Sequence, residues 1–131
     1  MIVVRLETIA MKFVVVTKDE EVKREAERAF HPEDRVTVTD DWRLGLDACE
    51  GADMIFVDQL ATLDIPHKIA GYEKFAEAKM AHPDAATVPL TLIWPPEGYE
   101  LDYMTGYPNF IFQHIQRPVT FQKVRRASTY V

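Results

Sequence analysis

The stretch 53–58 reads Asp-Met-Ile-Phe-Val-Asp and sets four apolar residues in a row between two aspartates. An apolar run of this kind is typical of a parallel strand that is buried on both faces. Two more runs of the same kind occupy 12–17 (KFVVVT) and 88–94 (VPLTLIW). Residues 35–39 (RVTVT) alternate as a half-buried strand does, and 110–115 (FIFQHI) completes a predicted set of five strands.

Segments with helical periodicity separate these strands. We predict helices over 18–30, from Asp40 or Asp41 to Glu50, over a segment with Pro66 in its first turn, and over 121–130. Asp19 is the expected N-cap of the first helix, because its short side chain can accept hydrogen bonds from the first free N–H groups. The third helix is expected to turn four side chains toward the core: Ile69, Tyr72, Ala76 and Met80.

Strands that alternate with helices form an α/β fold with a parallel sheet. Five strands in about 120 residues suit a flavodoxin-like, doubly wound sheet of order 2-1-3-4-5 with helices on both faces. Ligands of such folds bind beyond the carboxyl ends of the strands. The sequence places six candidate site residues at that edge: Thr17, Lys18, Asp19, Asp58, Trp94 and Arg117.

Length and composition limit the classes of function. The 131 residues suffice for one domain, and the 47 % of apolar residues excludes a disordered chain. A net charge of −6 disfavours nucleic acid as a partner, because an acidic surface repels phosphates. Cys49 is the single cysteine, which rules out an internal disulfide and fits a cytoplasmic protein.

The amino terminus differs from the rest of the chain. No apolar run reaches the roughly 18 residues of a membrane span, so no membrane association is expected. Residues 1–10 lack the pattern of a secretory signal, and we interpret them as an extension. Met11 opens a cleaner strand and is an alternative natural start, so the predicted domain is 11–131.

Over most of 11–130 the chain resembles the receiver domains of response regulators in two-component signalling, the CheY-like family. Residues 12–16 (KFVVV) resemble the first strand of that family. Residues 53–58 resemble its third strand, which ends in the phosphate-accepting aspartate. Ile115-Gln-Arg-Pro118 resembles its fifth strand, whose motif is normally Lys-Pro. The resemblance therefore implies that Asp58 is the candidate phosphoacceptor.

The chain departs from the family at three site positions. Receivers hold Mg²⁺ on two acidic residues after the first strand, where this chain has Thr17 and Lys18. Trp94 stands in place of a small hydroxyl residue, and Arg117 in place of the lysine. Mg²⁺ requires oxygen ligands, and an ammonium group repels the ion. We therefore interpret the chain as a divergent receiver or pseudo-receiver.

These departures predict a site without metal or other cofactor. Asp19, Glu20 and Asp58 are the remaining, weak candidates for metal ligands, and Mg²⁺ enters only if Asp58 is phosphorylated. Without a metal ion, a cation of the chain, Lys18 or Arg117, is expected within ion-pair distance of Asp58.

The function predicted from these features is a stand-alone signalling or protein-interaction module that is not an enzyme and has no catalytic residue. A partner protein or a second copy is expected on the face formed by 88–94, 110–115 and 121–130, as the resemblance implies. One alternative is a phospho-accepting response regulator that uses Asp58; another is a ligand-binding protein or enzyme of flavodoxin-like fold. Three tyrosines recur at a spacing of four and would lie on one side of a helix, where they would either pack against the core or bind a partner: Tyr99, Tyr103 and Tyr107.

Overall fold

The computed structural model describes residues 10–63, 70–96 and 109–130. The elements follow one another in this order: β1 (Lys12–Val16), α1 (Glu20–Ala29), β2 (Arg35–Thr39), α2 (Trp42–Asp47), β3 (Met54–Asp58), the 3₁₀ helix η2 (Gln59–Thr62), α3 (Ala70–Ala81), β4 (Leu90–Ile93), β5 (Gln113–Ile115) and α4 (Phe121–Ser128). No helix within these described ranges is long and apolar enough to cross a membrane.

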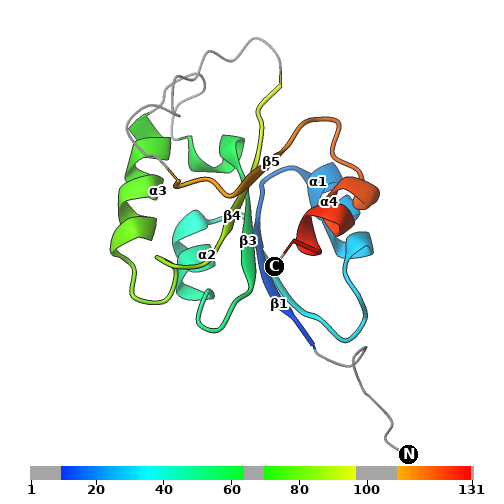
Figure 1. Ribbon diagram of the computed structural model, residues 1–131. Helices are drawn as coiled ribbons and strands as arrows, with labels where there is room; N and C mark the ends of the chain where they lie inside the picture. The colour runs from blue at the N-terminus through cyan, green and yellow to red at the C-terminus, as the bar shows by residue number, and fades with distance from the viewer. Residues whose placement is uncertain (1–9, 64–69, 97–108, 131) are drawn as a thin grey trace, which may run out of the picture.

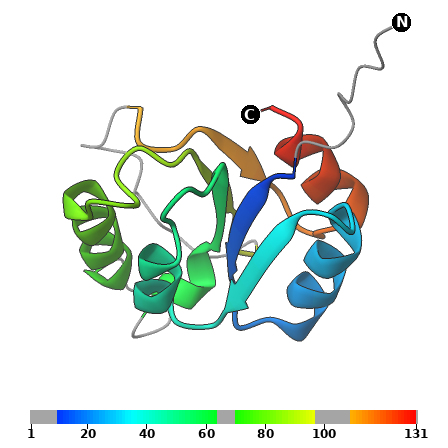
Figure 2. The same ribbon diagram turned by 90° about the horizontal axis from the view of Figure 1, so that it is seen from below.

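The five strands form one sheet of order β2-β1-β3-β4-β5, and every neighbouring pair is parallel. Helices α1 and α4 cover one face, and α2 and α3 cover the other (Figure 1). The view from below shows the same three layers with the sheet in the middle (Figure 2). The predicted flavodoxin-like sheet, its strand order and its two-sided cover of helices are confirmed.

Two apolar cores fill the space between the layers. One packs Val14, Val16 and Ile55 of the sheet against α2 and α3, and the other packs Phe13 and Phe56 against α1 and α4. Alternate residues of β1 and β3 thus point to opposite faces, as a pleated strand requires. Both strands are buried on two sides, which explains their continuous apolar sequence.

Polar caps fix where the first two helices begin. Asp19 accepts hydrogen bonds from the backbone N–H of Glu21 and Val22, as predicted for an N-cap. Asp41, rather than Asp40, caps α2 by accepting from the N–H of Arg43. Helix α1 thus begins shortly after β1 ends, and α2 begins shortly after β2 ends, so both helices start at the carboxyl edge of the parallel sheet.

The predicted face of α3 is correct for Tyr72 and Ala76 and wrong for Met80. Tyr72 and Ala76 are fully buried, whereas Met80 is 46 % exposed. At about 100° per residue, Met80 lies roughly a quarter turn away from the face centred on Tyr72, Phe75 and Lys79. Pro66 and Ile69 lie outside the described residues.

Strand β5 is shorter than the predicted 110–115. Phe110 turns toward the α2–α3 core, where its ring lies 6.2 Å from that of Phe75, and Phe112 is half exposed. Only Gln113–Ile115 pair with β4, in register with Thr91–Ile93, at the edge of the sheet. The sheet therefore presents a short outer edge beside α4.

Candidate functional site at the carboxyl edge of the sheet

Asp58 is the last residue of β3 and lies at the carboxyl edge beside β1 and β4. Its Cα is paired in register with that of Ile93, and its side chain is only 1 % exposed. The carboxylate also caps η2, because Oδ1 accepts from the backbone N–H of Leu60 at 3.1 Å. A buried carboxylate at this position needs further partners to offset the loss of hydration.

Two side chains supply those partners. Thr17, the residue after β1, donates its hydroxyl to Oδ2 of Asp58 at 2.9 Å. Arg117, which follows β5, places Nη2 at 2.5 Å from Oδ1. Both carboxylate oxygens of Asp58 are therefore engaged. The prediction that a cation pairs with Asp58 is confirmed, and the cation is Arg117.

The guanidinium of Arg117 joins three parts of the site. Besides Asp58, Nη1 lies 3.2 Å from Oδ2 of Asp19, and Nε donates to the backbone carbonyl of Trp94 at 2.9 Å. A guanidinium can do this because its donors form a rigid planar fork. Its side chain is 17 % exposed. Arg117 therefore closes the space between the loops that follow β1, β3 and β4.

Asp19 is held by the same network. Its backbone N–H donates to Oγ1 of Thr17 at 3.1 Å, and its carboxylate both caps α1 and pairs with Arg117. Thr17 is buried, and its hydroxyl connects Asp19 to Asp58, because it accepts from the N–H of Asp19 and donates to the carboxylate of Asp58. The start of α1 is thus attached to the end of β3 by a continuous chain of hydrogen bonds.

The other predicted site residues do not enter this network. Lys18 is exposed, and in the described ranges it forms no ion pair with Asp58, so the sequence-based alternative that Lys18 is the built-in cation is wrong. Glu20 is exposed in the first turn of α1. Trp94 contributes its carbonyl, while its ring lies 4.8 Å from that of His114, outside the site.

No group of three or more His, Cys, Asp or Glu side chains among the described residues could hold a metal ion. Of the three weak metal candidates, Asp19 and Asp58 lie on either side of one guanidinium. The oxygens that could face a cation therefore face a cation of the chain itself. The residues do not fit Mg²⁺ while Arg117 is in place.

The structure also reveals a residue that sequence reasoning missed. Gln59 directly follows Asp58, is fully buried, and has no hydrogen-bond partner for its amide among the described residues. A polar residue in the first turn after a buried strand was the available signal, but nothing in the sequence shows that this turn faces the interior. Tyr99, Tyr103 and Tyr107 lie outside the described residues.

Several solved structures are similar to this chain over most of its length. The phosphorylated cyanobacterial phytochrome response regulator RcpA matches with a TM-score of 0.67 at 14 % identity, over 93 % of this chain and 94 % of its own. The Vibrio cholerae chemotaxis response regulator CheY4 matches with 0.63 at 15 %, over 92 % and 98 %. The bacteriophytochrome response regulator RtBRR matches with 0.65 at 17 %, over 92 % and 77 %.

This chain has the fold of response-regulator receiver domains. The resemblance seen in the strand motifs is thereby confirmed at the level of the fold over about nine-tenths of the chain. No family model matches the sequence, and no curated protein matches it. In the frame of the receiver fold, Asp58 ends the third strand and Arg117 follows the fifth.

Proposed function

We propose that this chain is a signalling module of the receiver fold that acts by binding another protein, and that Asp58 is not phosphorylated by the Mg²⁺-dependent route. One observation carries the proposal: the guanidinium of Arg117 bonds Asp58, Asp19 and the Trp94 carbonyl at once. A guanidinium therefore pairs with two of the carboxylates, those of Asp19 and Asp58, that were candidates for metal ligands.

Phosphoryl transfer to a carboxylate needs an oxygen that can approach the phosphorus in line, and cations that neutralise the moving phosphoryl group. Asp58 meets neither requirement in this arrangement. Its two oxygens accept hydrogen bonds from Thr17, Leu60 and Arg117, and the side chain is buried. Attack on a phosphodonor would first require that Arg117 leaves.

The same geometry supports binding rather than catalysis. Within the described residues, the site combines one acid, one hydroxyl and one guanidinium that satisfy one another. No free nucleophile with an adjacent base remains there for chemistry. We place the interaction on the face of β4, β5 and α4, and we expect a cytoplasmic protein without a cofactor or a nucleic-acid partner.

Intact-mass measurement after incubation with acetyl phosphate and Mg²⁺ tests the proposal. The expected result is an unchanged mass, because Arg117 keeps both the metal and the donor from Asp58. RcpA, whose structure was solved in a phosphorylated state, serves as the positive control under identical conditions. A mass gain of one phosphoryl group that is absent from Asp58→Asn would overturn the proposal.

The phospho-accepting alternative has one specific observation in its favour. Asp58 stands at the end of β3 in a fold shared with the phosphorylated RcpA. The phospho-accepting alternative requires that Arg117 moves away from Asp58 and that Asp19 or Glu20 turns toward a metal ion. Titration of Mg²⁺ against the wild type and Arg117→Ala, followed by NMR, separates the two, since only the alternative predicts binding by the wild type.

A ligand-binding protein or enzyme is the second alternative. Two hollows of the described surface lie between β5 and α4 and at the amino ends of β4 and β5, and neither is lined by Thr17, Asp58 or Arg117. A ligand bound in contact with Thr17, Trp94 and Arg117 at the carboxyl edge would favour this alternative.

A further inference from the structure

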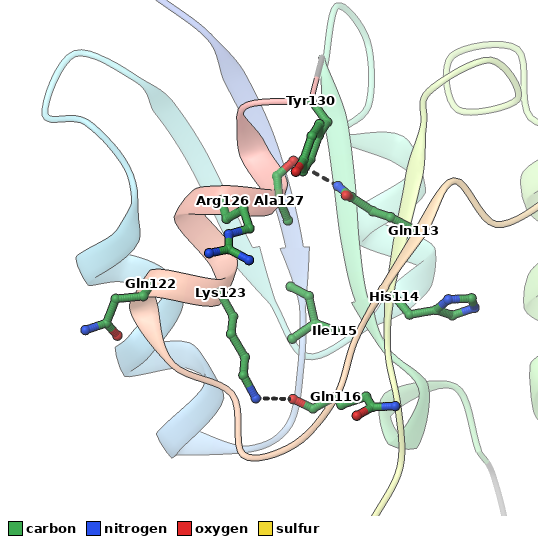
Figure 3. A pocket seen from close by; sticks show the side chains of 9 residues that line it. All are labelled: Gln113, His114, Ile115, Gln116, Gln122, Lys123, Arg126, Ala127 and Tyr130. Atoms are coloured by element: carbon green, nitrogen blue, oxygen red, sulfur yellow. Dashed lines mark hydrogen bonds between the residues drawn. The ribbon is translucent and has the colours of Figure 1, made fainter.

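An open groove runs between β5 and α4. It encloses about 560 Å³, and Figure 3 shows its walls. Ile115 and Ala127, both buried, form an apolar floor. Gln113, His114 and Gln116 line the strand side, and Gln122, Lys123, Arg126 and Tyr130 line the helix side.

Two hydrogen bonds hold the walls at a fixed separation. At one end Nε2 of Gln113 donates to the carbonyl of Ala127 at 2.8 Å, and at the other Nζ of Lys123 donates to the carbonyl of Gln116 at 3.0 Å (Figure 3). The groove is therefore formed before any ligand arrives. A preformed site avoids much of the entropy cost of ordering its own side chains on binding.

The charge of this region is opposite to that of the chain. Residues 103–131 carry four Lys or Arg and no Asp or Glu, although the whole chain has 15 basic and 21 acidic residues. Lys123 and Arg126 are three residues apart in α4, so they lie on one face of the helix and both reach the groove. The groove is thus a basic surface on an acidic protein.

The charges of these two residues are not neutralised within the described part of the chain. Lys123 bonds only the carbonyls of Gln116 and Pro118, which are neutral. The guanidinium of Arg126 has no described partner, in contrast to Arg125, which donates to carbonyls at the end of α1. An exposed cation that forms no described ion pair is available to an anion from outside.

We propose that this groove binds an extended, acidic peptide segment of a partner protein. The carboxylates of the segment meet Lys123 and Arg126, and its apolar side chains lie on Ile115 and Ala127. Its main chain follows the outer edge of β5, which pairs with no other strand in the described ranges. An edge strand offers unpaired backbone groups to such a segment. This inference names the partner class for the interaction module proposed above and rests on it for its biological role.

Fluorescence anisotropy with a labelled peptide in which glutamate alternates with valine tests the inference. We expect the wild type to bind this peptide at low ionic strength and to bind it more weakly at high salt. Lys123→Glu/Arg126→Glu should lower the affinity by at least about ten-fold, because two attractive pairs become repulsive. Arg35→Glu is the matched control, since it reverses an exposed charge on β2 at the opposite edge of the sheet.

Several outcomes would overturn the inference. These are no binding by the wild type, an equal loss in Arg35→Glu and the double variant, or equal binding of a lysine–valine peptide. Light scattering in which the wild type is a dimer and the double variant a monomer would mean that a second copy occupies the groove. Tighter binding of single-stranded DNA than of the acidic peptide would assign the basic surface to nucleic acid instead.

The two proposals fail in different measurements. A phosphorylated Asp58 together with peptide binding would refute the closed site and keep the groove. An unchanged mass without peptide binding would keep the closed site and refute the groove. Circular dichroism of the double variant shows whether it is folded, and its two substitutions are on exposed positions of α4.

Discussion

Replacing Arg117 with methionine should leave the Asp58 carboxylate buried with a hydroxyl and a single amide for partners. The side chain of Asp58 is 1 % exposed, so water cannot replace the lost guanidinium without a local opening of the site. Removing one partner of a buried ion pair typically costs about 3–5 kcal/mol in the free energy of unfolding. Because Arg117 itself is 17 % exposed, we expect a loss near the lower limit, about 3 kcal/mol.

Urea denaturation followed by circular dichroism measures this loss. A domain of this size commonly has a stability of about 5–15 kcal/mol, so the variant should still fold and give a complete transition. Arg126→Met is the matched control, because that arginine is exposed and has no described partner. It should change the stability by no more than about 0.5 kcal/mol.

A double-mutant cycle identifies the cause of the loss. In Asp58→Asn the buried charge is absent, so Arg117→Met should then cost only about 1 kcal/mol, the scale of a hydrogen bond. The reasoning is refuted if Arg117→Met costs the same in both backgrounds, or if it costs less than about 1 kcal/mol in the wild type, as a solvent-exposed pair would.

Two further predictions concern packing and pH. A Cβ on Gly45 would lie 2.5 Å from Cγ2 of Val16. Gly45→Ala should therefore push α2 away from the sheet and lower the free energy of unfolding by about 1–3 kcal/mol. The control Gly51→Asn, at a φ of +73° with no atom within 4 Å of its Cβ, should lower it much less. His114 is exposed, yet its ring lies against Trp94, and this partial burial lowers its pKa below the usual 6.5. Since the unfolded chain then binds the proton more readily, stability should be complete above pH 6.5 and fall as the pH drops below it, and urea titrations of His114→Gln should show a weaker fall.

The strand runs of the sequence already determined the fold. Continuous apolar segments such as 12–17 and 53–58 have to be buried on both faces of a sheet. They alternate with helical segments that begin at capping residues such as Asp19. Local periodicity, local capping and the short connections all favour the same parallel sheet. These properties depend on neighbours in the chain, so they can be recognised without coordinates.

The sequence also predicted correctly that Thr17, Asp58 and Arg117 lie at one edge of the sheet, because parallel strands have their carboxyl ends on the same side. It therefore predicted that at least one of Lys18 and Arg117 would pair with Asp58, but it did not decide which. The choice depended on the direction of two flexible side chains. Lys18 precedes a capped helix and points to water, whereas Arg117 can reach Asp19, Asp58 and the Trp94 carbonyl together.

The remaining features were decided by tertiary contacts alone. Strand β5 is short because Phe110 turns into the core beside Phe75, and the position of the strand beside α4 forms the basic groove. Similarly, the two oxygens of Asp58 are occupied by groups that lie 41 and 59 residues away in the chain. Contacts over such separations leave no periodic signal in a sequence, because each depends on the packing of the whole sheet and its helices.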